Sequence, residues 1–337
     1  MNPARREPLG KTELQVTQLG IGTVPIGGLY QAVSDEAAQA TLQAAWDAGI
    51  RFYDTAPLYG FGLAERRLGA FLATKPRDEY VLATKVGRLL RADALMDPDL
   101  VRDGEVLFRS GLPLQPVFDF SYDGVMRSFA ESLARLGLDR VDILHIHDPD
   151  DYYDQALAGA FKALDKLRGE GVIKAVGAGM NQAEMLTRFA REAAFDCFLL
   201  AGRYTLLDQS ALAELLPTCA RLGIKIIIGG VYNSGILTDP RPGAKFNYRE
   251  ADYEWLEKAQ RIQAVCDRYD VPLPAAAIQF PLAHPAVATI LTGVRSPDEL
   301  RQNVAYCQLP IPPELWDELR AMELIPAYAP APGEVMA

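Results

Sequence analysis

A short segment near the start of the chain, residues 49–60 (GIRFYDTAPLYG), contains an acid and a phenol that are suited to chemistry. Residues 51–54 are typical of a strand, and Pro57 ends it because proline has no N–H for a sheet and disfavours helix in the residue before it. Asp54 therefore ends a strand, and Tyr59 lies in the turn that follows. Both are poor core residues, so we interpret them as candidates for acid–base catalysis.

Other ionisable residues follow other apolar segments. Lys85 lies near the end of YVLATKV, and His147 ends VDILHIH. An ammonium near a tyrosine lowers the tyrosine pKa from about 10, and a carboxylate such as Asp54 holds the ammonium in place. The sequence therefore predicts that Tyr59 acts as a general acid or base near neutral pH, with His147 orienting a substrate oxygen.

Two later segments are suited to binding an anion. The turn GGVYNSG has a backbone that can approach a diphosphate closely, through Gly229, Gly230, Asn233, Ser234 and Gly235. Residues 296–299 (SPDE) open a helix, and helix N-termini favour anions. Neither pattern is specific by itself.

Alternating strands and helices must position these groups. Strands are predicted at residues 14–23, 51–54, 80–86, 141–147, 172–178, 195–200, 224–229 and 287–292. Helices are predicted at residues 34–48, 63–73, 122–136, 154–169, 182–193, 209–222, 251–269, 274–283 and 297–306. Near-continuously apolar strands such as IKIIIG require a sheet buried on both faces. Eight strands separated by helices favour an α/β fold closed as a (β/α)8 TIM barrel over an open doubly wound sheet.

Three features lie outside this alternation. A Gly-Lys-Thr turn at residues 10–12 predicts a small N-terminal hairpin. Residues 88–120 and 238–248 have no stable period, so we expect long loops at the C-terminal mouth, where the active sites of such barrels lie. No linker separates two domains, so residues 1–337 are expected to form a single domain.

Composition and charge exclude several classes of protein. The net charge is -10 and no basic run offsets it, which argues against nucleic acid or an anionic membrane as partner. The 4 cysteines form no CxxC pair, so we expect reduced thiols. The N-terminus has no apolar signal region, and no apolar run reaches about 18 residues. The sequence predicts a cytoplasmic protein without a membrane partner and indicates no oligomeric state.

Two other functional classes stay open from the residues alone. His145 and His147 lie on one face of a strand and, with Asp54 or Asp148, would form part of a metal-dependent hydrolase site. Such a site needs more ligands, and His284 is the only other histidine, so we predict no metal. A non-catalytic regulatory subunit is the second alternative, because a barrel alone does not determine function.

The order of motifs along nearly the whole chain resembles the aldo-keto reductases. These motifs are GIGTVPIGG, AGIRFYDTAPLYGFGLAERRLG, ATKVG, VDILHIHDP, GVIKAVGAG, YNSGILT and TGVRSPDELRQN. The segments VDILHIHDPD, FDFSYDG and AGRYTLL further resemble the sugar-oxidising branch, the D-threo-aldose 1-dehydrogenases (L-fucose dehydrogenases). The resemblance implies a (β/α)8 barrel that binds a nicotinamide dinucleotide without a Rossmann domain.

The resemblance also implies roles for particular residues. The family's catalytic tetrad falls on Asp54, Tyr59, Lys85 and His147. His147 is preferred to His145 because the family histidine directly precedes the x-Pro that is Asp148-Pro149 here. The residues implied to bind the cofactor are Thr23, Asn181, Gly230, Asn233, Ser234, Gly235, Gly293, Arg295, Ser296, Glu299 and Asn303.

The chain departs from the family pattern around the nicotinamide. The Ser-Asn pair that holds the carboxamide reads Gly179-Met180 here, so this role moves to Asn181. A tyrosine that commonly stacks on the nicotinamide aligns with Gly229.

At the adenosine end, the Lys and Arg that grip the 2'-phosphate of NADP align with Gly293 and Glu299. A carboxylate there favours NAD, while Arg295 and Ser296 leave NADP possible. The implied function is oxidation of a free aldose of the L-fucose, D-arabinose or L-galactose type to the aldonolactone. Tyr59 is then the general base and the hydride goes to the nicotinamide. An NADPH-dependent aldehyde or ketone reductase of the same fold is the alternative.

Overall fold

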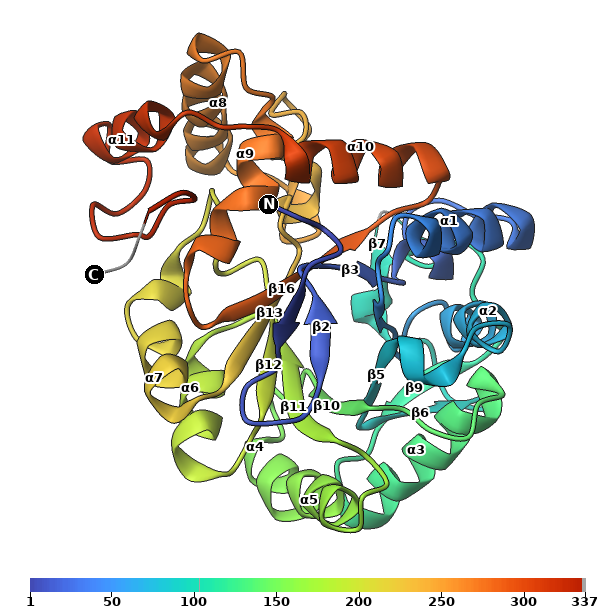
Figure 1. Cartoon of the computed structure of the whole chain (residues 1–337). Coiled ribbons are helices and arrows are strands. Elements are labelled where there is room, and N and C mark those ends of the chain that lie inside the picture. Colours follow the sequence, from blue (N-terminus) through green and yellow to red (C-terminus); the bar gives the residue numbers. More distant parts are fainter. Residues whose placement is uncertain (103, 335–337) are drawn as a thin grey trace.

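The computed structural model describes residues 1–102 and 104–334, and its centre is a closed barrel of eight parallel strands (Figure 1). In order around the barrel these are β3 (Leu19–Gly22), β4 (Phe52–Asp54), β5 (Val81–Val86), β10 (Ile143–His147), β11 (Ala175–Met180), β12 (Cys197–Ala201), β13 (Lys225–Gly229) and β16 (Val287–Gly293). The predicted (β/α)8 barrel is confirmed.

The strands are apolar because both of their faces are buried. Ile226, Ile227 and Ile228 of β13, for example, are all fully buried. Successive side chains along this strand face alternately the surrounding helices and the barrel interior. The register pairs His145 of β10 with Lys85 of β5. These two polar residues therefore lie side by side near the C-terminal end of the barrel.

Helices surround the barrel in the predicted order. They are α1 (Asp35–Asp47), α2 (Leu63–Leu72), α3 (Tyr122–Leu136), α4 (Tyr153–Gln155), α5 (Lys162–Gly169), α6 (Glu184–Glu192), α7 (Leu215–Leu222), α8 (Tyr253–Arg268), α9 (Leu273–Gln279), α10 (Pro297–Gln308) and α11 (Pro313–Ala321). Short 3-10 turns are η1 (Pro25–Gly27), η2 (Arg77–Glu79), η3 (Pro98–Leu100), η5 (Ser210–Leu212), η6 (Asn233–Gly235) and η7 (Phe280–Ala283). Ser34 caps α1, since its hydroxyl accepts from the N–H of Ala37.

Four helices differ from the prediction. The helix predicted at residues 274–283 is α9 followed by the 3-10 turn η7. The helix predicted at residues 154–169 is divided by a π-helical segment, η4 (Ala156–Phe161), which apolar spacing does not distinguish from an α-helix. The helix predicted at residues 209–222 is a 3-10 turn followed by α7. Helix α11 was not predicted; it lies beside α8, outside the barrel (Figure 1).

The N-terminal hairpin is confirmed and closes the bottom of the barrel. Strands β1 (Arg6–Pro8) and β2 (Gln15–Thr17) pair in antiparallel fashion. Leu9, Leu14 and Val16 join one apolar cluster with barrel residues such as Phe52 and Ile227. The predicted strand at residues 14–23 is therefore two strands, because β2 belongs to the hairpin and β3 to the barrel.

The prediction that residues 88–120 form a loop without elements is wrong. This insertion contains β6 (Arg88–Arg91) paired with β9 (Gln115–Phe118), and β7 (Val101–Arg102) paired with β8 (Glu105–Val106). Such short ladders carry no clear alternation, so the sequence does not reveal them. A second hairpin, β14 (Lys245–Phe246) with β15 (Arg249–Glu250), follows the loop after β13.

Candidate active site

A buried ion pair joins the C-terminal ends of β4 and β5. Lys85 Nζ donates to Asp54 Oδ1 at 2.5 Å and to the carbonyl oxygen of Thr55 at 3.0 Å. Burial raises the pKa of Asp54, and the Lys85 ammonium opposes that rise. Each charge therefore depends on the other, because an unpaired buried charge is strongly destabilising.

Tyr59 lies in the turn between β4 and α2, next to this pair. Its N–H donates to the carbonyl oxygen of Ala56 at 3.1 Å. The centre of its ring is 4.7 Å from Lys85 Nζ and 5.9 Å from the centre of the His147 ring, which it meets edge-on. The four residues predicted as a tetrad are thus brought together at one end of the barrel.

The pKa of Tyr59 differs from the sequence-based expectation. Burial, followed by the charge of Asp54, raises it well above its ordinary value of about 10. Asp148 acts in the same direction and Arg88 opposes it. The expectation that Lys85 lowers this pKa is wrong for this structure, because desolvation of the phenolate is the larger effect. Tyr59 is therefore a phenol that holds its proton.

The two histidines of β10 are buried and differ in what they face. Burial, with Arg88 and Lys85 adding to it, lowers the pKa of His147 well below its usual value, and burial lowers that of His145 to about 3. His147 borders a cavity, whereas His145 packs so closely on Gly177 that a Cβ there would lie 2.2 Å from its Nδ1. The geometry supports neutral His147 as the substrate-facing residue.

A second ion pair lies directly beside His147. Arg88 Nη2 donates to Asp148 Oδ2 at 3.0 Å, and this oxygen is 3.5 Å from His147 Nε2. Gly87 has a φ of 101°, which turns the chain sharply from β5 into β6, and a Cβ on it would collide with Phe120. Sequence reasoning missed Arg88 because its segment has no period. The glycine directly after a strand was the available signal.

Two cavities at the barrel mouth meet at Tyr59. The larger, of about 1340 Å³, is bordered by Lys85, His147 and Asp148. The smaller, of about 610 Å³, is bordered by Asp54 and by the glycine-rich turn after β13. Because Tyr59 borders both cavities, a group bound in one cavity can lie next to a group bound in the other, beside Tyr59.

The walls of the larger cavity come mainly from the two insertions. Residues 88–120 contribute among others Phe118, and the segment around β14 and β15 contributes Phe246 to Asp252 together with Trp255. None of residues 325–334 borders either cavity, and Arg320 instead binds the tail through Ala329 and Glu334.

The smaller cavity fits a nicotinamide dinucleotide. It extends from Asp54 and Tyr59 to Arg295 at the start of α10. Nine of the predicted cofactor residues border it: Asn181, Gly230, Asn233, Ser234, Gly235, Gly293, Arg295, Glu299 and Asn303. Thr292 Oγ1 and Asn233 Oδ1 are buried without a partner among the described residues, so they are available to a bound group.

Thr23 and Ser296 are not brought to this cavity. The Ser296 hydroxyl accepts from the N–H of Glu299 at 3.2 Å and caps α10. Thr23 is fully buried, and its Oγ1 has no partner within the described part of the chain. Both predictions came from the family resemblance, which shows neither the engagement of Ser296 in a helix cap nor the burial of Thr23 outside the cavity.

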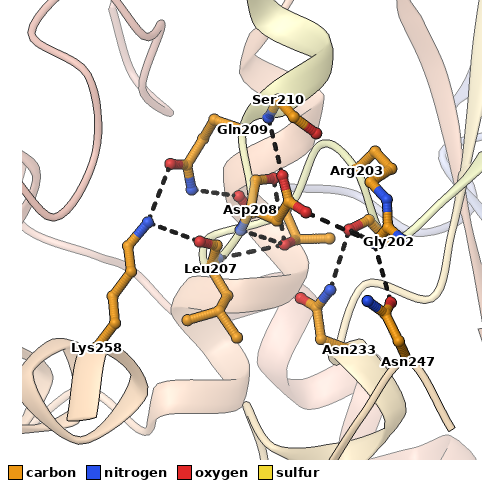
Figure 2. A network of polar contacts seen from close by, with 10 residues as sticks. Gly202, Arg203, Leu207, Asp208, Gln209, Ser210, Asn233, Asn247 and Lys258 are labelled. Carbon is orange, nitrogen blue, oxygen red and sulfur yellow. Dashed lines mark hydrogen bonds and ion pairs between the residues drawn. The ribbon is translucent and has the colours of Figure 1, made fainter. Parts of the chain in front are cut away.

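The turn after β13 is fixed by the loop that follows β12. Asn233 and Ser234 both have positive φ, of 46° and 60°, which only a well-supported turn tolerates in residues other than glycine. Asn233 Nδ2 donates to the carbonyl oxygen of Gly202 at 3.1 Å (Figure 2). Lys258 of α8 donates to the carbonyl oxygen of Leu207 at 2.7 Å and holds the same loop from the other side (Figure 2).

The tip of the β14–β15 hairpin spans both cavities through Asn247 and Tyr248. Arg203 donates to Asn247 Oδ1 at 3.0 Å (Figure 2), and the Tyr248 N–H donates to Ser234 Oγ at 3.1 Å. Sequence reasoning missed Tyr248, since a tyrosine in a loop carries no distinguishing pattern. It brings an aromatic ring to the mouth although Gly229 itself has none.

Arg295 and Glu299 form a local ion pair at the far end of the smaller cavity. The Glu299 carboxylate accepts from the Arg295 N–H at 2.9 Å and from its guanidinium at 3.2 Å. The guanidinium is therefore already neutralised by a carboxylate. Gly293, the other position that differs from the NADP pattern, packs on Pro25.

Residues 1–102 and 104–334 contain neither a candidate metal site nor a helix that could cross a membrane. The His, Cys, Asp and Glu side chains there form no group of three or more that could hold a metal ion. In the same residues, every helix is too short or too polar to cross a membrane.

Comparisons with known proteins agree with the fold. The sequence profile of the Aldo/keto reductase family matches residues 18–323. A D-threo-aldose 1-dehydrogenase from a Pseudomonas species is 48% identical over 93% of this chain and 96% of that protein. A pyridoxal 4-dehydrogenase from Microbacterium luteolum is 45% identical over 96% of this chain and 99% of that protein. The L-galactose dehydrogenase of Arabidopsis thaliana is 31% identical over 88% of this chain and 86% of that protein.

A solved structure of a putative aldo-keto reductase from Pseudomonas aeruginosa is 27% identical, with a TM-score of 0.63 over 89% of this chain and 93% of that chain. The chain therefore belongs to the aldo/keto reductase family. It is an oxidoreductase of that family, whose members use nicotinamide cofactors.

Proposed function

We propose that this protein oxidises the anomeric hydroxyl of a free aldose, of the L-fucose, D-arabinose or L-galactose type, to the aldonolactone. The observation that carries this proposal is the position of Tyr59 where the two cavities meet, next to Lys85 and His147. A substrate hydroxyl in the larger cavity can there approach a cofactor in the smaller one. Two relatives named for aldose oxidation, at 48% and 31% identity, support the substrate class.

In this proposal each residue of the tetrad has a separate task. Tyr59 takes the proton of the anomeric hydroxyl, and His147, neutral, hydrogen-bonds the same oxygen. Lys85, whose Nζ lies 4.7 Å from the centre of the Tyr59 ring, stabilises the phenolate, and Asp54 keeps Lys85 charged and in place. When bound, the oxidised nicotinamide supplies the hydride acceptor. The raised pKa of Tyr59 makes its deprotonation the difficult part of the oxidation.

We further propose that NAD is the preferred cofactor. The 2'-phosphate of NADP would meet the Glu299 carboxylate, which already neutralises Arg295. A free ribose hydroxyl can instead donate to a carboxylate. We also propose that the reaction takes place in the cytoplasm, since all four cysteines are buried free thiols. The chain is proposed to act as a single barrel domain.

The proposal is tested by mixing the protein with NAD or NADP and a panel of sugars, and following the absorbance of the reduced nicotinamide. We expect turnover with L-fucose, D-arabinose or L-galactose, and a higher kcat/KM with NAD. Small aldehydes with NADPH are the comparison for a carbonyl reductase. Fast aldehyde reduction without oxidation of any aldose would overturn the proposal.

Pyridoxal is the second candidate substrate. The relative named pyridoxal 4-dehydrogenase is 45% identical over nearly the whole chain. Phe118 and Tyr152 both border the larger cavity, with their ring centres 5.3 Å apart, and could stack on a pyridine ring. Pyridoxal therefore belongs in the same assay. A kcat/KM for pyridoxal above that of every sugar would favour this candidate.

A further inference from the structure

The ion pair of Arg88 and Asp148 has no task in the tetrad, yet it borders the larger cavity beside His147. Asp148 Oδ2 is the atom shared between the two neighbours, at 3.0 Å from Arg88 Nη2 and 3.5 Å from His147 Nε2. The pair is therefore fixed within reach of any substrate that His147 contacts.

The protein holds the Arg88 side chain firmly. The guanidinium carbon lies 4.5 Å from the centre of the Phe118 ring, and β6 and β9 place the two residues opposite each other. Arg88 is only 8% exposed. A planar donor group stacked on an aromatic ring keeps its orientation, which a flexible surface arginine does not.

Both members of the pair keep at least one polar atom free, and among the described residues Arg88 Nε is buried without a partner. Among the described residues, Arg88 Nη1 donates to no protein atom and Asp148 Oδ1 accepts from none. Asp148 remains partly exposed, with 21% of its side chain accessible. A donor and an acceptor side by side match a hydroxyl group, which both accepts and donates a hydrogen bond.

The surrounding charge indicates an uncharged ligand. The cavity wall contains seven acidic residues, Asp97, Asp99, Asp148, Asp150, Asp151, Glu250 and Asp252, against four basic ones, Lys85, Arg88, Arg102 and Arg249. Lys85 and Arg88 are moreover already paired with carboxylates. A phosphorylated or acidic substrate would be repelled, whereas a neutral polyhydroxyl compound would not.

We propose that Arg88 and Asp148 form a clamp that recognises the hydroxyl on the carbon next to the reacting carbon of the sugar. This inference rests on the proposed function and adds a specificity-determining site to it. The oxygen on the reacting carbon lies between Tyr59 and His147, and the clamp lies beside His147. The neighbouring hydroxyl therefore donates to Asp148 Oδ1 and accepts from Arg88.

The test compares L-fucose with 2-deoxy-L-fucose in the holoenzyme. The wild-type protein should prefer L-fucose by about 10- to 100-fold in kcat/KM, as expected for a hydrogen bond to a charged group. Asp148→Asn keeps the shape and removes the charge. We expect it to lower kcat/KM for L-fucose at least tenfold and to bring the ratio of the two sugars close to one. Asp154→Asn, an exposed carboxylate of α4, should leave the ratio unchanged.

Each other outcome has a defined meaning. Equal losses for both sugars in Asp148→Asn would overturn the clamp and make Asp148 a positioning residue for His147. An unchanged ratio would also overturn it. If Asp148→Asn does not fold, Arg88→Lys replaces it, because it keeps the charge and removes the planar donor group, and the ratio should again fall. A wild-type protein that oxidises none of L-fucose, D-arabinose and L-galactose overturns the proposed function, and the clamp with it.

Discussion

The two cavities meet at Tyr59 but are lined by different groups. Six glycines border the smaller cavity, at positions 22, 202, 229, 230, 235 and 293, together with three charged residues, Asp54, Arg295 and Glu299. The larger cavity has one glycine, Gly179, and eleven charged residues. The smaller is thus shaped by backbone from the barrel, and the larger by side chains from inserted segments.

This difference indicates a division of labour. Backbone atoms can approach a ligand closely and change little with sequence, which suits a cofactor of constant shape. Side chains on inserted strands can change independently of the barrel, which suits a variable substrate. This division of labour agrees with relatives that are named for different substrates, namely an aldose, L-galactose and pyridoxal.

The largest expected effect concerns the point where the cavities meet. Tyr59→Phe removes the group that moves the proton, so we expect kcat to fall by about 10²- to 10⁴-fold. The dissociation constant for NAD, measured by quenching of protein fluorescence, should change less than about threefold. Tyr80→Phe, which removes a hydroxyl in the core next to Trp46, is the matched control. Near wild-type turnover in Tyr59→Phe would contradict the assigned role.

The next prediction distinguishes a catalytic role from a stabilising role of the buried ion pair between Lys85 and Asp54. Lys85→Met leaves the Asp54 carboxylate unpaired, and we expect a loss of about 3–5 kcal/mol in the free energy of unfolding along with most of the activity. Adding Asp54→Asn removes the unpaired charge. The double variant should regain stability in urea unfolding while kcat stays low.

If the double variant also regained activity, Lys85 would act only through the stability of the fold. The phenolate would then not depend on the ammonium at 4.7 Å.

We expect kcat/KM for oxidation to change tenfold per pH unit because of the titration of Tyr59. The raised pKa means that the phenolate is the rare form, so kcat/KM for oxidation should rise with a slope near one between pH 7 and 9. In the reverse direction the phenol acts as an acid, and the rate should be nearly constant over the same range. A plateau of the oxidation rate below pH 8 would mean that the bound state lowers this pKa, as the sequence first suggested.

The smallest effect lies at the far end of the smaller cavity. Glu299→Gln removes one exposed negative charge near the adenosine, so the ratio of kcat/KM for NADP over NAD should rise about two- to fivefold, the size of an exposed charge interaction. Glu254→Gln on α8 is a control outside the cavity. A ratio that does not move would show that Glu299 takes no part in the choice of cofactor.

The sequence predicts the barrel well because buried parallel strands and amphipathic helices have clear periods. It also predicts that Asp54, Lys85 and His147 lie at or next to the ends of such strands, and the structure brings them together there, while their catalytic roles stay a prediction. It does not reveal Arg88 or Tyr248, whose positions depend on short ladders without alternation. The pKa of Tyr59 was predicted in the wrong direction because a sequence shows the neighbouring charges but not the depth of burial.

The most direct test of the central claim is to follow the anomeric hydrogen itself. L-Fucose deuterated at its anomeric carbon is incubated with the protein and NAD, and the reduced cofactor is analysed by mass spectrometry and NMR. We predict one deuterium per reduced nicotinamide, the lactone in equal amount, and no transfer in Tyr59→Phe over the same time. Deuterium released to water, or reduced cofactor without label, would contradict hydride transfer from the sugar between the two cavities.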